Sequence, residues 1–180
     1  MYKMSKHKKY VITAMCITLC SVLPLVLHAI PAAGSTILPM HIPVLLCGLI
    51  AGPYFGLLAG LFGPLLSSFT TGMPLMAYVP VMMVELGIFG AVTGLLINII
   101  RTKNQYFNIY ASLIPAMILG RIIAGVVRML FFAPALLQET TVIAWWLTSY
   151  FVTSLPGIII QLILIPAIII ALEKSNLVRK

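Results

Sequence analysis

Three ionisable side chains, Glu85, Arg121 and Arg128, lie inside long apolar stretches of this 180-residue sequence. A charge among apolar side chains costs at least a few kcal/mol unless it is paired or hydrated. Arg121 and Arg128 are seven residues apart, so a helix would present both on one face. A carboxylate and two guanidinium groups can pair with one another or bind a ligand's carboxylate or phosphate. These residues are therefore the first candidates for a site.

Charge is scarce in the rest of the chain as well. The sequence has 11 basic and three acidic residues, no Asp, and 62% hydrophobic residues. An ordinary soluble domain is roughly one quarter charged, so this composition, with a mean hydropathy of +1.15, indicates an integral membrane protein. Without Asp, the chain cannot carry a Ser-His-Asp triad, a paired-Asp metal site or a Walker-B carboxylate of that type.

The apolar runs predict an all-α membrane protein with six transmembrane helices. A helix that crosses a bilayer needs about 20 apolar residues, so six spans leave no room for a soluble catalytic domain. We expect one integral membrane domain over residues 1–180. The predicted spans are 10–30, 41–51, 54–70, 78–100, 107–132 and 142–172, the last being long enough to tilt or to include an interfacial segment.

The remaining basic residues indicate the orientation of these spans. With six spans, all nine fall on one side, whereas the opposite loops contain only Glu139 as a charged residue. By the positive-inside rule, both termini lie in the cytoplasm of a multi-pass cell-membrane protein. This placement also explains the net charge of +8 without nucleic acid as a partner. A signal peptide cleaved near residues 29–33 is an alternative, although the first apolar run is longer than a typical signal core.

The same topology places the three intramembrane charges in the outer half of the bilayer. From the helical rise, Glu85 lies roughly 10 Å, Arg121 roughly 17 Å and Arg128 roughly 6 Å below the outer boundary. Glu85 is then expected to reach Arg121, either as a structural ion pair or as part of a polar pocket. Such a pairing leaves a surplus cation, which would suit the carboxylate or phosphate of a ligand.

Aromatic residues and a histidine gather at the same predicted level and could complete a substrate site. Trp and Tyr there also form interfacial belts, and a lone His at a helix end is often only a hydrogen bonder. The predicted substrate-binding residues besides the three charges are His41, Tyr78, Trp146 and Tyr150, and Trp145 is a neighbour of these. No His/Glu spacing supports a metal site, no cofactor is expected, and the three cysteines are interpreted as packing residues.

Small residues predict close helix packing. Gly48, Gly52, Gly56 and Gly60 are spaced by four, and Gly52-Pro53 would interrupt a continuous helix. We therefore expect a tight hairpin whose small-residue faces pack within the chain or against a partner protein. A second small pair, Ala14 and Thr18, lies in the first span.

Residues 36–74, followed by a span bearing Glu85 and by Gly120-Arg121 in the next, resemble the substrate-binding S component of an energy-coupling factor (ECF) transporter. The resemblance extends to six spans, size and a basic amino end. It implies that the first span carries an A-x-x-x-A motif that docks on the transmembrane T component. Here Ala14 and Thr18 occupy the two small positions, so Thr replaces the second Ala.

The resemblance further implies a binder of a water-soluble vitamin, captured outside and released inside. Energy would come from partners, namely a T component and two ATPase subunits, because the chain has no phosphate-binding loop. Fold similarity does not determine the substrate. The charges favour an anionic vitamin such as pantothenate, with pyridoxine-type vitamin B6 compounds close behind and folate as a further candidate.

Two other functional classes of membrane protein would need different sequence features. A self-sufficient secondary transporter or channel would predict an inverted repeat, but the halves of the sequence do not match in hydropathy. An intramembrane enzyme would need a nucleophile, a base or a metal site, and those combinations are lacking. The sequence therefore favours a binding subunit that is not an enzyme.

Overall fold

The computed structural model describes residues 4–27, 36–136 and 146–175, and within these ranges it contains helices and no strand. The long helices are α1 (Lys6–Leu27), α3 (His41–Ala51), α4 (Pro53–Thr71), α5 (Val79–Ile99), α6 (Gln105–Leu136) and α8 (Leu155–Lys174). A 3₁₀ turn, η1 (Met76–Tyr78), precedes α5, and a π-helical segment, η2 (Thr148–Val152), precedes α8. The all-α prediction is confirmed.

The predicted spans agree with these helices to within a few residues. The span 41–51 coincides with α3, and 54–70 and 78–100 each differ from α4 and α5 by one residue at either end. Helix α1 begins at Lys6, before the predicted first span, and the basic residues form its first turns. In the last predicted span the described part divides into η2 and α8, so a separate segment does precede the final helix.

Five of the described helices are long and apolar enough to cross a membrane. They cover Lys6–Leu27, Pro53–Thr71, Met76–Ile99, Gln105–Phe131 and Tyr150–Lys174. The sixth, α3, has 11 residues and a length of about 16 Å, which is roughly half of a bilayer core. Ten of its residues are buried, so α3 is an interior helix and reaches little lipid.

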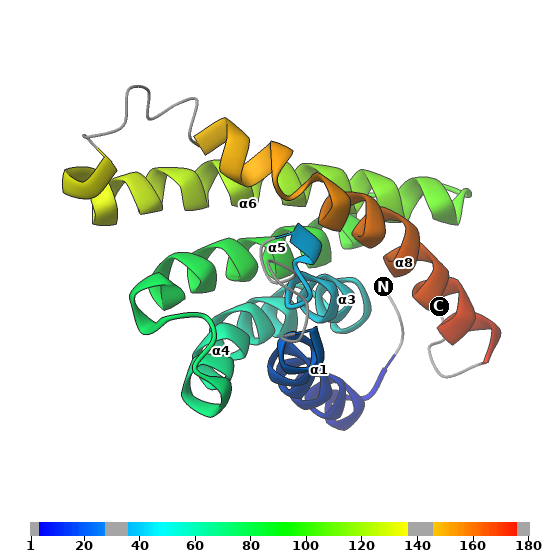
Figure 1. Ribbon diagram of the computed structural model, residues 1–180. Coiled ribbons are helices and arrows are strands. Elements are labelled where there is room, and N and C mark those ends of the chain that lie inside the picture. Colours follow the sequence, from blue (N-terminus) through cyan, green and yellow to red (C-terminus); the bar gives the residue numbers. More distant parts are fainter. Residues whose placement is uncertain (1–3, 28–35, 137–145, 176–180) are drawn as a thin grey trace.

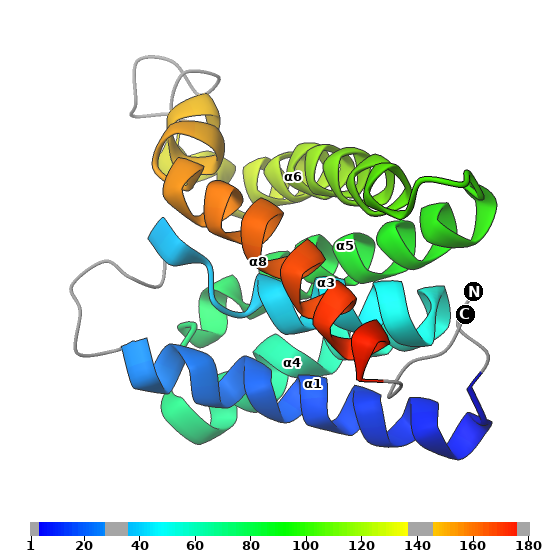
Figure 2. The same cartoon turned by 90° about the vertical axis from the view of Figure 1, so that its right-hand side faces the viewer.

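Helix α3 lies in the middle of the molecule, in contact with α1, α4, α5 and α8 (Figures 1 and 2). The start of α1, the end of α8 and the connection between α5 and α6 lie at one end of the bundle (Figure 2). These segments include Lys6, Lys8, Arg101, Lys103 and Lys174. The described segments that carry these basic residues therefore lie at one end of the bundle, and the prediction that this end faces the cytoplasm stays a prediction.

A glycine turn reverses the chain between α3 and α4. Gly52 has φ 104°, a left-handed value that favours glycine, and Pro53 then begins α4 with the fixed φ that suits a first helical position. The hairpin predicted from the glycine spacing is confirmed.

The small-residue faces of this hairpin pack within the chain, against α5. A Cβ atom on Gly90 would lie 2.9 Å from Gly56 Cα and closer still to the Gly56 carbonyl. One on Gly56 would in turn lie 2.8 Å from Gly48 Cα. The backbones of α3, α4 and α5 thus approach one another more closely than any side chain would allow.

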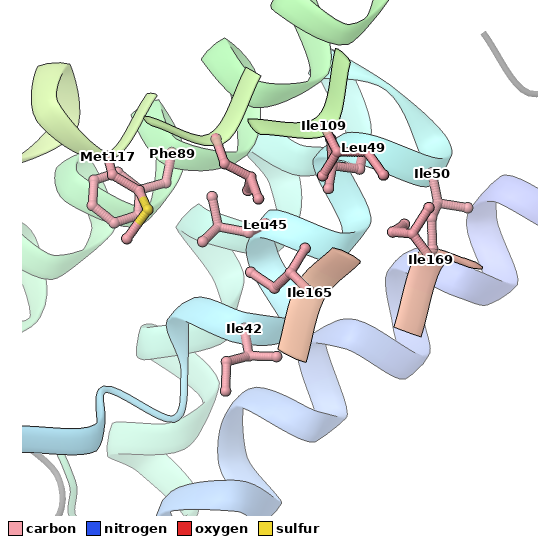
Figure 3. Packing of buried hydrophobic residues seen from close by; sticks show 10 residues of the cluster. Ile42, Leu45, Leu49, Ile50, Phe89, Ile109, Met117, Ile165 and Ile169 are labelled. Carbon is pink, nitrogen blue, oxygen red and sulfur yellow. The ribbon is translucent and has the colours of Figure 1, made fainter. Parts of the chain in front are cut away.

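The apolar core lies where α3, α5, α6 and α8 meet (Figure 3). Its ten buried members are Ile42, Leu45, Leu49, Ile50, Phe89, Ile109, Leu113, Met117, Ile165 and Ile169. Large apolar side chains also cover the outward faces of the long helices, for example Val26 on α1 and Ile163 on α8. An apolar exterior of this kind is suited to lipid.

Candidate functional site

The first turn of α3 and the middle of α5 bring a histidine to a carboxylate. His41 Nε2 lies 3.6 Å from Glu85 Oε1, and both side chains are buried. The His41 ring also packs edge-on against Phe89, one turn further along α5, with the ring centroids 5.2 Å apart. Neither nitrogen of His41 has a hydrogen-bond partner among the described residues. Packing therefore holds the pair in place, and both nitrogens of His41 can still form hydrogen bonds.

The expected partner of Glu85 was Arg121, and here the structure differs. Among the described residues, the ion-pair contact of Glu85 within 4.0 Å is with His41. Arg121 lies nearby on α6, because Gly120 faces the Glu85 carbonyl across the α5–α6 interface: a Cβ on Gly120 would lie 3.3 Å from that oxygen. Its side chain, however, extends toward η2. The chain after α6 therefore decides where Arg121 is held, and sequence spacing on α5 and α6 could not indicate it.

Arg121 is held by one nitrogen of its guanidinium group. Nη1 donates to the Tyr150 carbonyl oxygen and, at 2.7 Å, to Ser154 Oγ. The guanidinium carbon lies 5.8 Å from the centroid of the Phe151 ring, a cation–π distance. These contacts come from η2 and from the residue that precedes α8.

The other edge of the same guanidinium group is unoccupied by the described residues. Nε and Nη2 of Arg121 are buried and make no hydrogen bond within the part of the chain that the structure describes, and the residue is only 2% exposed. These two nitrogens point their hydrogens in parallel, the arrangement that binds both oxygens of a carboxylate. Leaving such donors without a partner in the interior is costly. The edge is thus suited to an anionic ligand.

The remaining predicted residues lie together around the second arginine. The Arg128 guanidinium carbon is 5.1 Å from the centroid of the Tyr78 ring, and Arg128 also interacts with the side chain of Tyr150. Trp146 and Tyr150 have ring centroids 6.5 Å apart. Phe151 connects these residues to the surroundings of Arg121, because its ring packs against the Arg121 guanidinium group and lies 5.5 Å from the ring of Trp146. Trp145 lies outside the described residues.

Two glycines on α6 make room for aromatic side chains of the site. A Cβ on Gly120 would overlap the Phe89 ring, and one on Gly125 would overlap the Trp146 indole, 2.7 Å from its Cε2. Trp146 Nε1 is buried there without a hydrogen-bond partner in the described parts of the chain. Only glycine at these positions permits the rings to lie flush against α6.

The sequence reasoning missed two polar residues, one directly before α8 and one within its first half. Ser154 receives a hydrogen bond from Arg121, and Gln161 is fully buried beside the segment that leads into α3. A signal was available, because both are polar, lie in an otherwise apolar run, and are seven residues apart on one helix face.

Other predicted features lie outside this site. Ala14 and Thr18 are exposed on α1, and the Thr18 hydroxyl donates to the Ala14 carbonyl oxygen at 3.0 Å. The three cysteines are buried with free thiols where α1 packs against the α3–α4 hairpin. Within the described ranges, no group of three His, Cys, Asp or Glu residues is placed to hold a metal ion.

Chemically, the site combines fixed cations with one carboxylate, surrounded by aromatic rings. It contains the Arg121 edge, Arg128 and the His41–Glu85 pair, so it can bind a carboxylate and can also exchange hydrogen bonds with hydroxyl groups. Polar groups placed precisely in an apolar surround are typical of small-molecule sites.

A family model described as "ECF transporter, substrate-specific component" matches residues 8–169 of the chain. The match begins in the first turn of α1 and ends within α8, and it includes every residue of the candidate site. No curated protein and no solved structure matches the chain.

Proposed function

The chain belongs to the substrate-specific components of ECF transporters, multi-pass membrane subunits that are not enzymes, and on that premise we propose that it binds a small anionic vitamin, with pantothenate as the first candidate. It captures the vitamin from outside the cell. Release inside is driven by a module of a transmembrane T component and two ATPase subunits.

One observation carries the anionic assignment: the buried Nε–Nη2 edge of Arg121, for which the described residues provide no acceptor. A carboxylate on this edge would accept two charge-assisted hydrogen bonds in parallel. The nearby His41 lies 3.6 Å from Glu85 and offers polar atoms to hydroxyl groups of the same ligand.

Pyridoxine-type compounds are the second candidate, on a separate observation. The His41–Glu85 pair, with the His41 ring packed against Phe89, can exchange hydrogen bonds with the ring hydroxyls of such a ligand. Folate carries carboxylates as well and belongs in the same panel. These candidates differ in whether the carboxylate dominates the affinity.

The test is a comparison of two ligands that differ in one group. Pantothenate and panthenol, in which an alcohol replaces the carboxylate, are titrated into the purified protein by calorimetry, with pyridoxine and folate in parallel. We expect pantothenate to bind at least a hundredfold more tightly than panthenol, and to raise the melting temperature. At a ligand concentration 100 times Kd the stabilisation is about 2.7 kcal/mol.

Equal affinity for pantothenate and panthenol would refute the anionic assignment. Tight binding of pyridoxine with no binding of pantothenate would move the substrate to the second candidate.

A further inference from the structure

Gln161 on α8 is a buried residue to which the site described above gives no role. Its side chain is fully buried, and Nε2 donates to the Leu38 carbonyl oxygen at 3.5 Å. A carbonyl can only accept, so this contact orients the amide and identifies the other atom as the oxygen. Oε1 has no hydrogen-bond partner among the described residues.

The surroundings of Gln161 give no packing reason for an amide. Its neighbours along α8, among them Ile158, Leu162 and Ile165, belong to the apolar core cluster. A buried acceptor without a donor is destabilising, and an Ile or Leu at this position would avoid that cost. A ligand that donates a hydrogen bond to Oε1 would explain why an amide occupies this position.

The position of Gln161 relates it to both halves of the candidate site. The Leu38 carbonyl that it contacts also accepts from the backbone N–H of His41 at 3.1 Å, so the amide lies beside the start of α3. Ser154, which holds Arg121, is seven residues earlier on the same face of α8. Two helical turns correspond to about 10 Å. Gln161 thus lies on the same face of α8 as the residue that holds Arg121, about two helical turns further along.

We propose that Gln161 is a specificity-determining residue, whose Oε1 accepts a hydrogen bond from a hydroxyl or amide N–H of the ligand. The inference rests on the proposed function and narrows it to an anion that also carries a hydrogen-bond donor apart from its carboxylate.

The experiment uses the full chain and two probes, pantothenate and an analogue in which hydrogen replaces the terminal hydroxyl. Kd is measured by calorimetry for wild type, for Gln161→Met, which keeps the shape without the acceptor, and for Ile163→Met, a matched change on the exposed face of α8. We expect Gln161→Met to weaken pantothenate binding about tenfold to a hundredfold. Its affinity for the analogue should equal that of wild type, and Ile163→Met should change neither.

Unchanged pantothenate binding by Gln161→Met, or an equal loss for both probes, would overturn the role of Gln161 while leaving the proposed function intact. If the variant does not fold, wild type alone decides, because equal affinity for pantothenate and the analogue would show that the hydroxyl is not recognised. Binding of neither probe to wild type would overturn both the inference and the proposed function.

Discussion

In the proposed site, one edge of the Arg121 guanidinium group contacts the protein and the other edge binds the ligand. Nη1 is used by the residues around η2, whereas the Nε–Nη2 edge has no acceptor within the described chain. Because one edge is fixed by the protein, the other is held ready in a single orientation. That preorganisation reduces the entropy lost on binding.

We therefore expect Arg121→Lys to bind pantothenate roughly tenfold to a hundredfold more weakly than wild type. Lysine keeps the charge but cannot make two parallel hydrogen bonds, a loss of about 1.5–3 kcal/mol. Calorimetry with pantothenate and panthenol measures the effect as a double-mutant cycle. An equal loss for both ligands would mean that Arg121 does not contact the carboxylate.

Arg128 is expected to act on binding more than on stability. It is half-buried, over the ring of Tyr78, so its truncation removes little core packing. Arg128→Ala should weaken pantothenate binding by more than about tenfold, or 1.4 kcal/mol. The melting temperature of the ligand-free protein should shift by only a few degrees.

The matched control is Arg101→Ala, in the exposed connection between α5 and α6 at the other end of the bundle. It should leave Kd unchanged. If Arg128→Ala binds pantothenate as wild type does, Arg128 has no part in the site.

At the scale of elements, the site depends on how closely α5 approaches the α3–α4 hairpin. Gly90 faces the backbone of Gly56, which in turn faces Gly48. This contact sets the register of α3 against α5, and with it the distance between His41 and Glu85. Backbone atoms cannot move aside as a side chain can.

Gly90→Ala is accordingly expected to destabilise the protein by about 1–3 kcal/mol or more, the usual cost of overpacking. Gly87→Ala on the same helix is the control, because its Cβ would meet Leu57 Cδ1, the end of a flexible side chain, at 3.2 Å. Thermal melting in detergent compares the two. Equal melting temperatures would contradict the assigned packing.

At the scale of the whole molecule, the exposed face of α1 is available to a partner. Ala14 and Thr18 lie on it, four residues apart, and small residues allow another helix to approach closely. In the proposed assembly this face meets the T component. The proposed ligand site lies elsewhere, on α3, α5, α6 and α8, so we expect mutations to separate docking from ligand binding.

Ala14→Leu should leave vitamin affinity unchanged but reduce uptake by about tenfold or more in cells that also express the coupling module. Such a loss corresponds to roughly 1.4 kcal/mol of docking free energy. Ala167→Leu, the same change at an exposed position of α8, serves as the control and should have no effect. Uptake of labelled vitamin with and without the module is the measurement. Efficient uptake by the chain alone would instead support a self-sufficient transporter.

The amino-acid sequence by itself determined the helices and the charges that matter. Hydropathy located the spans, the α3 bounds are those predicted, and Gly52-Pro53 correctly indicated the hairpin. The rarity of intramembrane charge selected Glu85, Arg121 and Arg128. These features are local: periodicity, glycine spacing and the cost of a charge in lipid are all properties of a short stretch of chain.

The tertiary structure alone decided which of these groups meet. His41 rather than Arg121 lies against Glu85, Arg121 is held by η2 and Ser154, and the Gln161 amide contacts the Leu38 carbonyl before α3. These contacts join residues 29 to 123 positions apart. They depend on helix register and on the path of the chain after α6, which the backbone approach at glycines fixes and no local pattern encodes.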